Sequence, residues 1–188
     1  DDRHTQELVN QMEVYYLANQ EEHLHFAVLG DFPDASQQRL PREHAHLKFA
    51  QQAVQALNEK YPGDETIFYL FQRQRQWNPV AGSWMGWERK RGKLEEFNRL
   101  LRGDTETSFL PMVGDIAVLQ GARFVITLDE DTQLPRDAAK RLIGTLAHPL
   151  NGAVLNAAGT RVVEGYGVLQ PRVTIGVTSA RRSLFAAI

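Results

Sequence analysis

The 188-residue chain contains no cysteine, which excludes disulfide bonds and thiolate metal sites. Any bound metal must therefore be held by oxygen or imidazole. The chain also lacks a charge excess: 21 basic and 23 acidic side chains give a formal net charge of -2. This charge is too small to gather nucleic acid or an anionic membrane surface by long-range attraction, so we expect no nucleic-acid partner.

Long apolar runs are also missing, since no stretch approaches the roughly 20 residues of a membrane-spanning helix. We expect this piece to be soluble and to form a single domain over residues 1–188. The sequence begins without Met and ends in the apolar stretch "RRSLFAAI". We therefore expect it to be the central part of a longer protein.

Segments with strand character alternate with segments of helical periodicity along the chain. The pattern predicts helices over residues 4–19, 42–60, 93–103 and 135–150. It predicts strands or extended segments over residues 24–30, 66–77, 122–131 and 161–175. This alternation is typical of an α/β fold with a mainly parallel sheet flanked by helices, which binds ligands beyond the carboxyl ends of its strands.

Two acids, Asp129 and Asp131, follow the apolar run "FVIT" at the end of the predicted strand over residues 122–131. Adjacent carboxylates repel each other unless a positive charge lies between them. They could hold Mg²⁺ or Mn²⁺, which accept a few carboxylates together with diphosphate oxygens. A solvated strand end is the alternative, and the pattern alone leaves both readings open.

An Asp-x-Asp pair after a buried strand also occurs in phosphohydrolases that use an aspartate nucleophile. Those enzymes have a threonine two residues after the second acid, where this chain has Gln133, and Thr132 comes one position too early. Their motif also stands near the start of the fold, whereas two predicted strands precede it here. The match to that class therefore fails on two counts.

Asp31 and Asp34 lie in the segment "GDFPDA" at the exit of the first predicted strand. Acids at this position can accept hydrogen bonds from a nucleobase or a ribose hydroxyl. A turn around Pro33, closed by an aspartate side chain, explains the same residues equally well.

The stretch "WMGWERKRGKLEEFN" combines two tryptophans with a cluster of cations at the start of a predicted helix. Cations at a helix N-terminus oppose the helix dipole, which favours a bound anion such as a diphosphate over a merely solvated basic face. Trp84 is a candidate for stacking on a sugar or base. The histidines at 23, 25, 44 and 46 form no convincing metal-ligand pair. The cations are Arg89, Lys90, Arg91, Lys93 and Arg99.

The stretches at residues 84–103, 124–151 and 161–173 closely resemble the glycosyltransferase domain of bacterial cyclic β-1,2-glucan synthases. The resemblance extends from about Val14 onward. More distantly, the layout is similar to the family-2 glycosyltransferases. These resemblances imply a nucleotide-diphospho-sugar transferase fold of the glycosyltransferase A type, incomplete at both ends. They also imply an enzyme that moves glucose from UDP-glucose to a growing β-glucan acceptor.

The resemblance also implies roles for individual residues. Asp129 and Asp131 match the metal motif, which would hold Mn²⁺ or Mg²⁺ against the donor diphosphate. Asp31, with Asp34, would contact the uridine. The other implied donor-site residues are Lys93, Asn98, Gln170 and Arg172, and the cluster with Arg89, Arg91 and Trp84 lies beside them.

Two departures from the family pattern affect the expected activity. The chain begins in the helix that follows the family's first strand, and the catalytic base belongs to a segment beyond the stretch at residues 183–185. We therefore expect donor-site residues without the base, an inactive isolated fragment, and an exposed sheet edge that favours self-association. The resemblance places the parent protein in a bacterial inner membrane, with this region facing the cytoplasm.

Two other functions stay open at the level of sequence. The chain could belong to a magnesium-dependent phosphohydrolase, despite the mismatched motif. It could also be a non-catalytic scaffold or interaction module, which would show no response to a nucleotide or a metal.

Overall fold

A computed structural model describes residues 2–172 of the chain. Residue contacts divide the chain into two compact units, residues 1–137 and 138–188, and each is described here by itself. The residues at 173–175, at the end of the expected extended segment, and the stretch at 183–185 lie outside the described range. A single domain over residues 1–188 stays a prediction.

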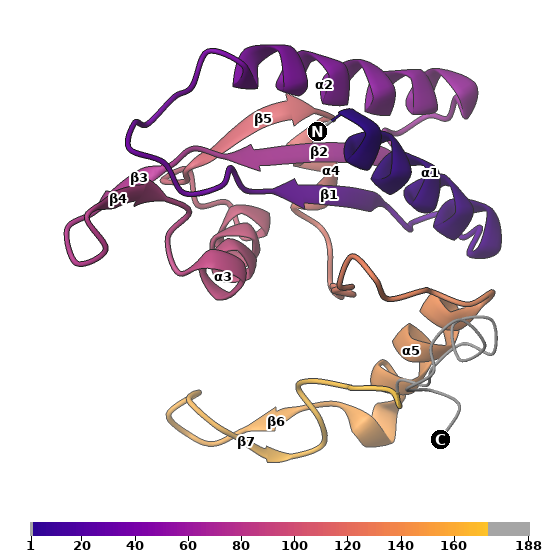
Figure 1. Ribbon diagram of the computed structural model, residues 1–188. Coiled ribbons are helices and arrows are strands. Elements are labelled where there is room, and N and C mark those ends of the chain that lie inside the picture. Colours follow the sequence, from indigo (N-terminus) through magenta and orange to yellow (C-terminus); the bar gives the residue numbers. More distant parts are fainter. Residues whose placement is uncertain (1, 173–188) are drawn as a thin grey trace, which may run out of the picture. The chain divides into compact units, whose positions relative to one another are not determined.

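The first unit is built on a three-stranded sheet with the order β1-β2-β5 (Figure 1). The strands β1 and β2 run parallel with Phe26 opposite Phe68, and β2 and β5 run antiparallel with Arg73 opposite Phe109. The sheet is therefore mixed within the described residues. Its strands are β1 (Phe26–Gly30), β2 (Phe68–Arg73) and β5 (Phe109–Val113).

Helices pack on both faces of this sheet, and the alternating side chains of β2 supply both cores. Phe68 and Leu70 pack with α1 and α2 in one hydrophobic cluster, while Tyr69 and Phe71 pack with α3 and α4 in the other. Every residue of β2 is buried, as expected for a central strand covered on both faces. The helices are α1 (Asp2–Ala18), α2 (Glu43–Lys60), α3 (Arg89–Leu101) and α4 (Ile116–Leu119).

The hydrophobic periodicity predicted these main elements of the first unit. The expected helices over residues 4–19, 42–60 and 93–103 and the strands near residues 24–30 and 66–77 are confirmed. The helix α3 begins at Arg89, four residues earlier than expected, so the basic run lies inside its first turns.

A small hairpin follows β2. The strands β3 (Gln76–Asn78) and β4 (Ser83–Met85) pair antiparallel and place Trp77 opposite Trp84. Trp84 also forms an isolated bridge with Ala35 through two backbone hydrogen bonds of 2.9 Å. The hairpin is thereby fixed to the loop that follows β1.

The prediction of a strand over residues 122–131 is wrong, because the structure has no helix or strand there. A strand is defined by hydrogen bonds to a neighbouring strand, and the apolar pattern of "FVIT" cannot supply that neighbour. The third strand of the sheet is β5, which the sequence reasoning missed.

The second unit, as far as residue 172, contains a helix, a short 3₁₀ turn and a hairpin. The hairpin strands pair antiparallel with Val154 opposite Glu164. No helix among the described residues of either unit combines the length and apolar character needed to cross a bilayer. The elements are α5 (Ala138–Leu146), the turn Pro149–Asn151, β6 (Val154–Leu155) and β7 (Val162–Glu164).

Two leucines in the first unit test how much of its stability comes from the core beneath α1 and α2. Leu57 is 4% exposed and Leu17 is 52% exposed. We expect Leu57→Ala to lower the free energy of unfolding by about 2–5 kcal/mol, because it removes buried methyl groups and leaves a cavity. The same change at Leu17 should alter it by about 0.5 kcal/mol or less. Urea denaturation measures both, and equal losses would contradict this packing.

Candidate functional site

The parallel pairing of β1 and β2 brings an acid and an arginine together at one edge of the sheet. Asp31 directly follows β1 and Arg73 ends β2. The guanidinium of Arg73 donates two hydrogen bonds to the carboxylate, with Nε to Oδ1 at 2.6 Å and Nη2 to Oδ2 at 3.1 Å. Such bidentate pairs are among the strongest hydrogen-bonded contacts in proteins and fix the orientation of both groups.

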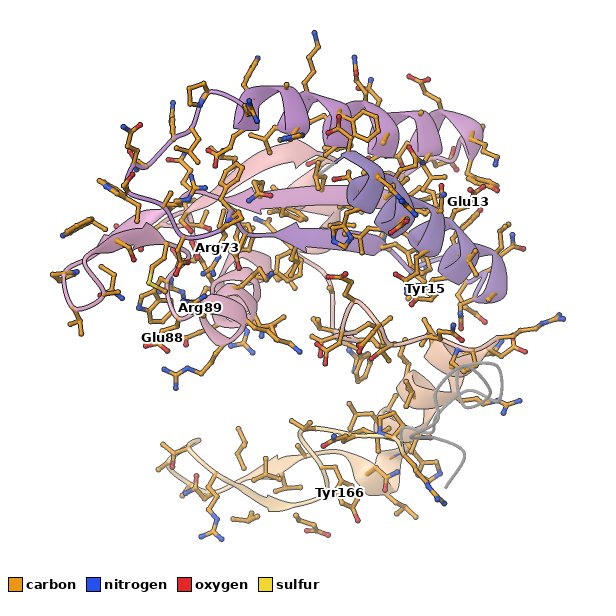
Figure 2. All side chains as sticks on the ribbon, in the orientation of Figure 1. Glu13, Tyr15, Arg73, Glu88, Arg89 and Tyr166 are labelled. Atoms are coloured by element: carbon orange, nitrogen blue, oxygen red, sulfur yellow. The ribbon has the colours of Figure 1, made fainter. Side chains whose placement is uncertain are left out.

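Arg73 is 1% exposed, and it contacts three more groups, one just before α3 and two within it. Its Nη1 lies 3.3 Å from Oε2 of Glu96 and 3.0 Å from the carbonyl oxygen of Trp87. Its Nη2 lies 2.9 Å from the carbonyl oxygen of Arg89, and Figure 2 labels both Arg73 and Arg89. A buried guanidinium needs this many partners because its charge has lost its water. Arg73 therefore joins β1, β2 and α3.

The backbone at the start of α3 is strained. Glu88 and Arg89 adopt positive φ angles of 49° and 47°, in the left-handed region that non-glycine residues seldom occupy. Each costs about 1–2 kcal/mol, and such residues persist only where surrounding contacts hold them. Arg73 supplies those contacts, because it donates hydrogen bonds to the carbonyl oxygens on either side of Glu88, those of Trp87 and Arg89.

The cations in the first turns of α3 meet carboxylates from two other segments of the first unit. Arg89 lies 2.8 Å from Asp34, and Lys93 lies 3.3 Å from Asp31. These acids come from the loop after β1. The structure thus brings together four of the predicted donor-site residues.

The third contact of α3 is an ion pair between Lys90 and Asp129. The sequence reasoning placed Lys90 in the basic cluster but gave it no individual role. Both side chains are more than half exposed. A chain of contacts therefore runs from Asp31 through Lys93 and along α3 to Asp129.

The two predicted metal ligands lie at a turn. The backbone N–H of Thr132 donates to the carbonyl oxygen of Asp129 at 2.9 Å, and Asp129 and Asp131 are both exposed. Within the described residues, no group of three or more acidic, histidine or cysteine side chains could enclose a metal ion. The binding of Mn²⁺ or Mg²⁺ by these two acids stays a prediction.

A polar stripe on α1 holds the segment that carries these acids. Gln11, Tyr15 and Asn19 recur at intervals of four residues and so share one side of the chain, with the last just past the helix end. Their side chains donate to the carbonyl oxygens of residues 130, 132 and 135 at 3.2, 2.5 and 3.3 Å, respectively. The acids are therefore positioned by α1 through backbone contacts.

Other predicted residues lie apart from these contacts. Asn98 is exposed on α3, five residues after Lys93, and a helix with 3.6 residues per turn places it on another side. Trp84 packs against Trp77 in the hairpin, with 5.8 Å between the centroids of the two rings. Arg91 forms a local ion pair with Glu88 at 3.0 Å.

Gln170 and Arg172 belong to the second unit. Both are exposed and lie outside its helices and strands. Their predicted part in lining a sugar site stays a prediction.

The sequence reasoning missed two buried arginines, Arg73 and Arg75. Arg75 is also 1% exposed; it pairs with Glu43 and donates to the carbonyl oxygen of Pro33 at 2.6 Å. The available signal was the alternation "QRQR", which directly follows the apolar run "FYLF" of β2. Arginines continuing a central strand are seldom free in solvent and normally have carboxylate partners.

The chain is similar to a bacterial glucan synthase along almost its whole length. The relative is the cyclic beta-(1,2)-glucan synthase NdvB of Rhizobium meliloti (strain 1021), with 46% identity over 177 residues, or 94% of this chain. The match confirms the resemblance to cyclic β-1,2-glucan synthases that the sequence motifs indicate. The chain spans only 6% of the length of that relative. No family model matches the chain.

Exchanging Arg73 tests whether one buried guanidinium holds the site together. We expect Arg73→Met to lower the free energy of unfolding by about 3–5 kcal/mol, because Asp31 and Glu96 lose their buried partner. Arg89→Met removes an exposed pair with Asp34 and should cost about 1 kcal/mol or less. Urea denaturation of the two variants gives the comparison, and a small loss for Arg73→Met would show that the network is not central.

The carboxyl of Glu96 makes stability depend on pH. Its burial raises the pKa, but hydrogen bonds from Ser108, Thr107 and Arg73 lower it by more, so the net pKa lies below the ordinary 4.5. The donors include the Ser108 backbone N–H and both hydroxyls, each hydroxyl at 3.0 Å. Because the folded state favours the charged form, the stabilisation is complete above the unfolded pKa and is lost as pH falls through the folded pKa.

We therefore expect Glu96→Gln to flatten the fall of the unfolding free energy between about pH 5 and pH 3. The matched control is Glu95→Gln, which changes an exposed side chain at the neighbouring position of α3. Chemical denaturation at several pH values measures the slopes. The same slope in Glu96→Gln as in the unmodified chain would contradict this assignment.

Proposed function

We propose that the chain is the donor-binding part of a glycosyltransferase region, whose parent protein transfers glucose from UDP-glucose to a growing β-1,2-glucan. The observation that carries this proposal is the meeting of Asp31, Asp34 and Asp129 with the cations of α3, in a chain similar to a glucan synthase over 94% of its length. Acids and cations side by side suit a ligand that combines hydroxyls, a diphosphate and a divalent cation.

We assign the fold to the nucleotide-diphospho-sugar transferases of the glycosyltransferase A type. The parallel pair β1 and β2, with helices on both faces of the sheet, supports this assignment. So does the location of Asp31 directly after β1, since α/β folds bind ligands beyond the carboxyl ends of parallel strands.

Asp129 and Asp131 are the residues that would hold Mn²⁺ or Mg²⁺. Two exposed carboxylates fit an ion that keeps several waters and shares the oxygens of a diphosphate. When bound, such an ion stabilises the negative charge of the leaving UDP. Asp31 and Asp34 would accept hydrogen bonds from the uridine, and Lys93 and Arg89 would approach the diphosphate.

The exposed ion pairs of α3 are suited to exchange partners. A surface pair contributes only about 0–1 kcal/mol, so a diphosphate can replace a carboxylate on Lys90 or Arg89 at little cost. Release of Lys90 frees the Asp129 carboxylate for a cation. In contrast, the buried pair of Arg73 with Asp31 is costly to break and keeps the loop after β1 in place.

Other parts of the reaction belong to the longer protein. The base that deprotonates the acceptor hydroxyl is expected beyond this chain. Asn98 would lie beside the donor, and Gln170 and Arg172 of the second unit would contact a sugar, as the resemblance implies. The isolated chain should therefore form no glucan. We place the parent protein in a bacterial inner membrane, with this region on the cytoplasmic side.

Binding of UDP and Mn²⁺ to the isolated chain tests this function. At about 100 times the dissociation constant the ligands should add about 2.7 kcal/mol to the unfolding free energy, visible as a raised melting temperature. Asp129→Asn should remove the stabilisation that depends on Mn²⁺. Asp64→Asn, an equal charge change at an exposed loop before β2, should leave it intact.

Differential scanning fluorimetry with UDP alone, Mn²⁺ alone and both together separates the contributions. No shift in any combination would contradict the proposed function and favour a scaffold. Release of phosphate from a chromogenic ester would instead favour a phosphohydrolase.

A further inference from the structure

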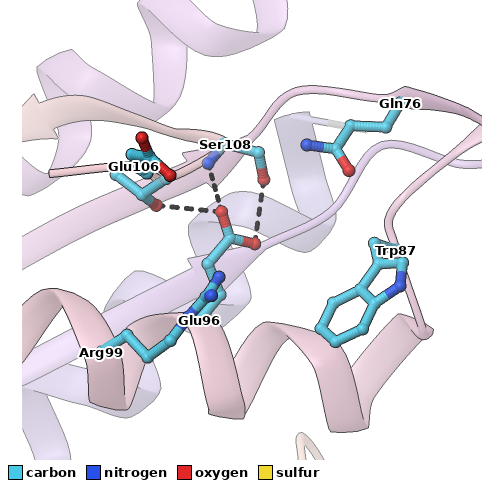
Figure 3. Close-up of a pocket in the computed structure, with 7 residues that line it drawn as sticks. Gln76, Trp87, Glu96, Arg99, Glu106 and Ser108 are labelled. Carbon is cyan, nitrogen blue, oxygen red and sulfur yellow. Dashed lines mark hydrogen bonds between the residues drawn. The ribbon is translucent and has the colours of Figure 1, made fainter. Parts of the chain in front are cut away.

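A cavity of about 510 Å³ opens beside α3, and its lining includes Glu96, a partner of Arg73 (Figure 3). Apart from Arg99 of the basic cluster, none of the residues predicted from the sequence for the donor site lines it. Figure 3 shows Gln76, Trp87 and Ser108 arranged around one space above the helix. Its lining includes Gln76, Trp87, Glu96, Arg99, Glu106 and Ser108.

The indole of Trp87 forms a fixed apolar surface of this cavity. A Cβ added at the buried Gly92 would lie 2.6 Å from Cε3 of Trp87, so the ring packs directly on the helix. The carbonyl oxygen of Trp87 is held by Arg73 at 3.0 Å. The side chain nevertheless remains 42% exposed, which leaves much of the ring open to a ligand.

Polar side chains with balanced charge surround the indole. Gln76 and Glu106 are exposed, and the half-exposed Arg99 lies 3.7 Å from Asp104. Glu96 is 4% exposed, and its charge is already matched by Arg73 and by the hydroxyls of the 106–108 segment. With one cation and one acid at the rim, the cavity attracts neither a phosphate nor a metal ion strongly.

A flat aromatic surface within a ring of hydrogen-bonding groups is complementary to a pyranose. The C–H faces of a sugar ring pack on an indole, while its hydroxyls reach amide, carboxylate and guanidinium groups at the rim. The volume lies within the range of about 300–1,000 Å³ that is usual for small-molecule sites. The charge balance favours a neutral saccharide over a nucleotide.

We propose that this cavity binds a glucosyl unit of a β-1,2-linked glucan, separately from the donor; the identity of this saccharide rests on the proposed function. Arg73 lies between the two sites, because it contacts Asp31 in the donor cluster and both Trp87 and Glu96 at the cavity. The cavity would retain the neutral polysaccharide near the site of transfer.

The chain itself allows a direct test by nuclear magnetic resonance. It has three tryptophans, so a ¹⁵N-labelled sample gives three indole N–H signals, assigned by substituting each in turn. We expect a β-1,2-linked glucotriose to shift the Trp87 signal in a saturable way at millimolar concentrations. An unmoved Trp87 signal, or a saturable shift of Trp87 with UDP alone, would overturn the proposal.

Two variants compare similar tryptophans inside and outside the cavity. Trp87→Ala should weaken binding of the glucotriose at least tenfold, whereas Trp77→Ala, which removes a 51% exposed indole from the hairpin, should change it less than twofold. Gln76→Ala provides a second test at an exposed rim position and should weaken binding several-fold even if Trp87→Ala does not fold. Unchanged binding in both Trp87→Ala and Gln76→Ala, or in the folded one of the two, would overturn the proposal.

The titration is repeated with UDP and Mn²⁺ present and with an α-1,4-linked glucotriose. Binding of the saccharide, together with no binding of UDP and Mn²⁺, supports the cavity while it contradicts the proposed function. UDP and Mn²⁺ binding without saccharide binding overturns this inference alone. Equal affinity for the α-linked sugar would overturn the assignment to β-1,2-glucan.

Discussion

The buried guanidinium of Arg73 is the interaction on which the candidate site depends. It joins the end of β1 through Asp31, the strained start of α3 through two carbonyl oxygens, and the segment before β5 through Glu96. The end of β1 and the start of α3 are far apart in sequence, and Arg73 contacts both directly. A group that is costly to bury is stabilised here because every partner is fixed by the fold.

Around this rigid centre the charges are arranged in two layers of different strength. The inner pairs, formed by Arg73 with Asp31 and Glu96, are shielded from water and hold the shape of the site. The outer pairs, formed by Arg89 and Lys90 with Asp34 and Asp129, are exposed and weak. The first layer holds the geometry of the candidate site, and the second supplies groups that can change partner.

Sequence periodicity predicted the helices α1, α2 and α3 and the strands β1 and β2, because each has a clear apolar side to bury. It failed at residues 122–131, where an apolar run has no neighbouring strand in the structure, and it missed β5. For the site, the acids at 31, 34 and 129 and the basic start of α3 were predicted, and they lie together. Arg73 was not, because its importance comes from partners at distant positions rather than from any local pattern.

The contacts between α1 and the turn at residues 129–132 have a consequence for how the site can respond. Gln11 and Tyr15 bind main-chain carbonyl oxygens, so the hold on this turn does not depend on which side chains it carries. The carboxylates of Asp129 and Asp131 therefore follow the position of α1 through the main chain of the turn. A small tilt or sliding of α1, for instance when another part of the longer protein presses on it, would carry both acids along as one body.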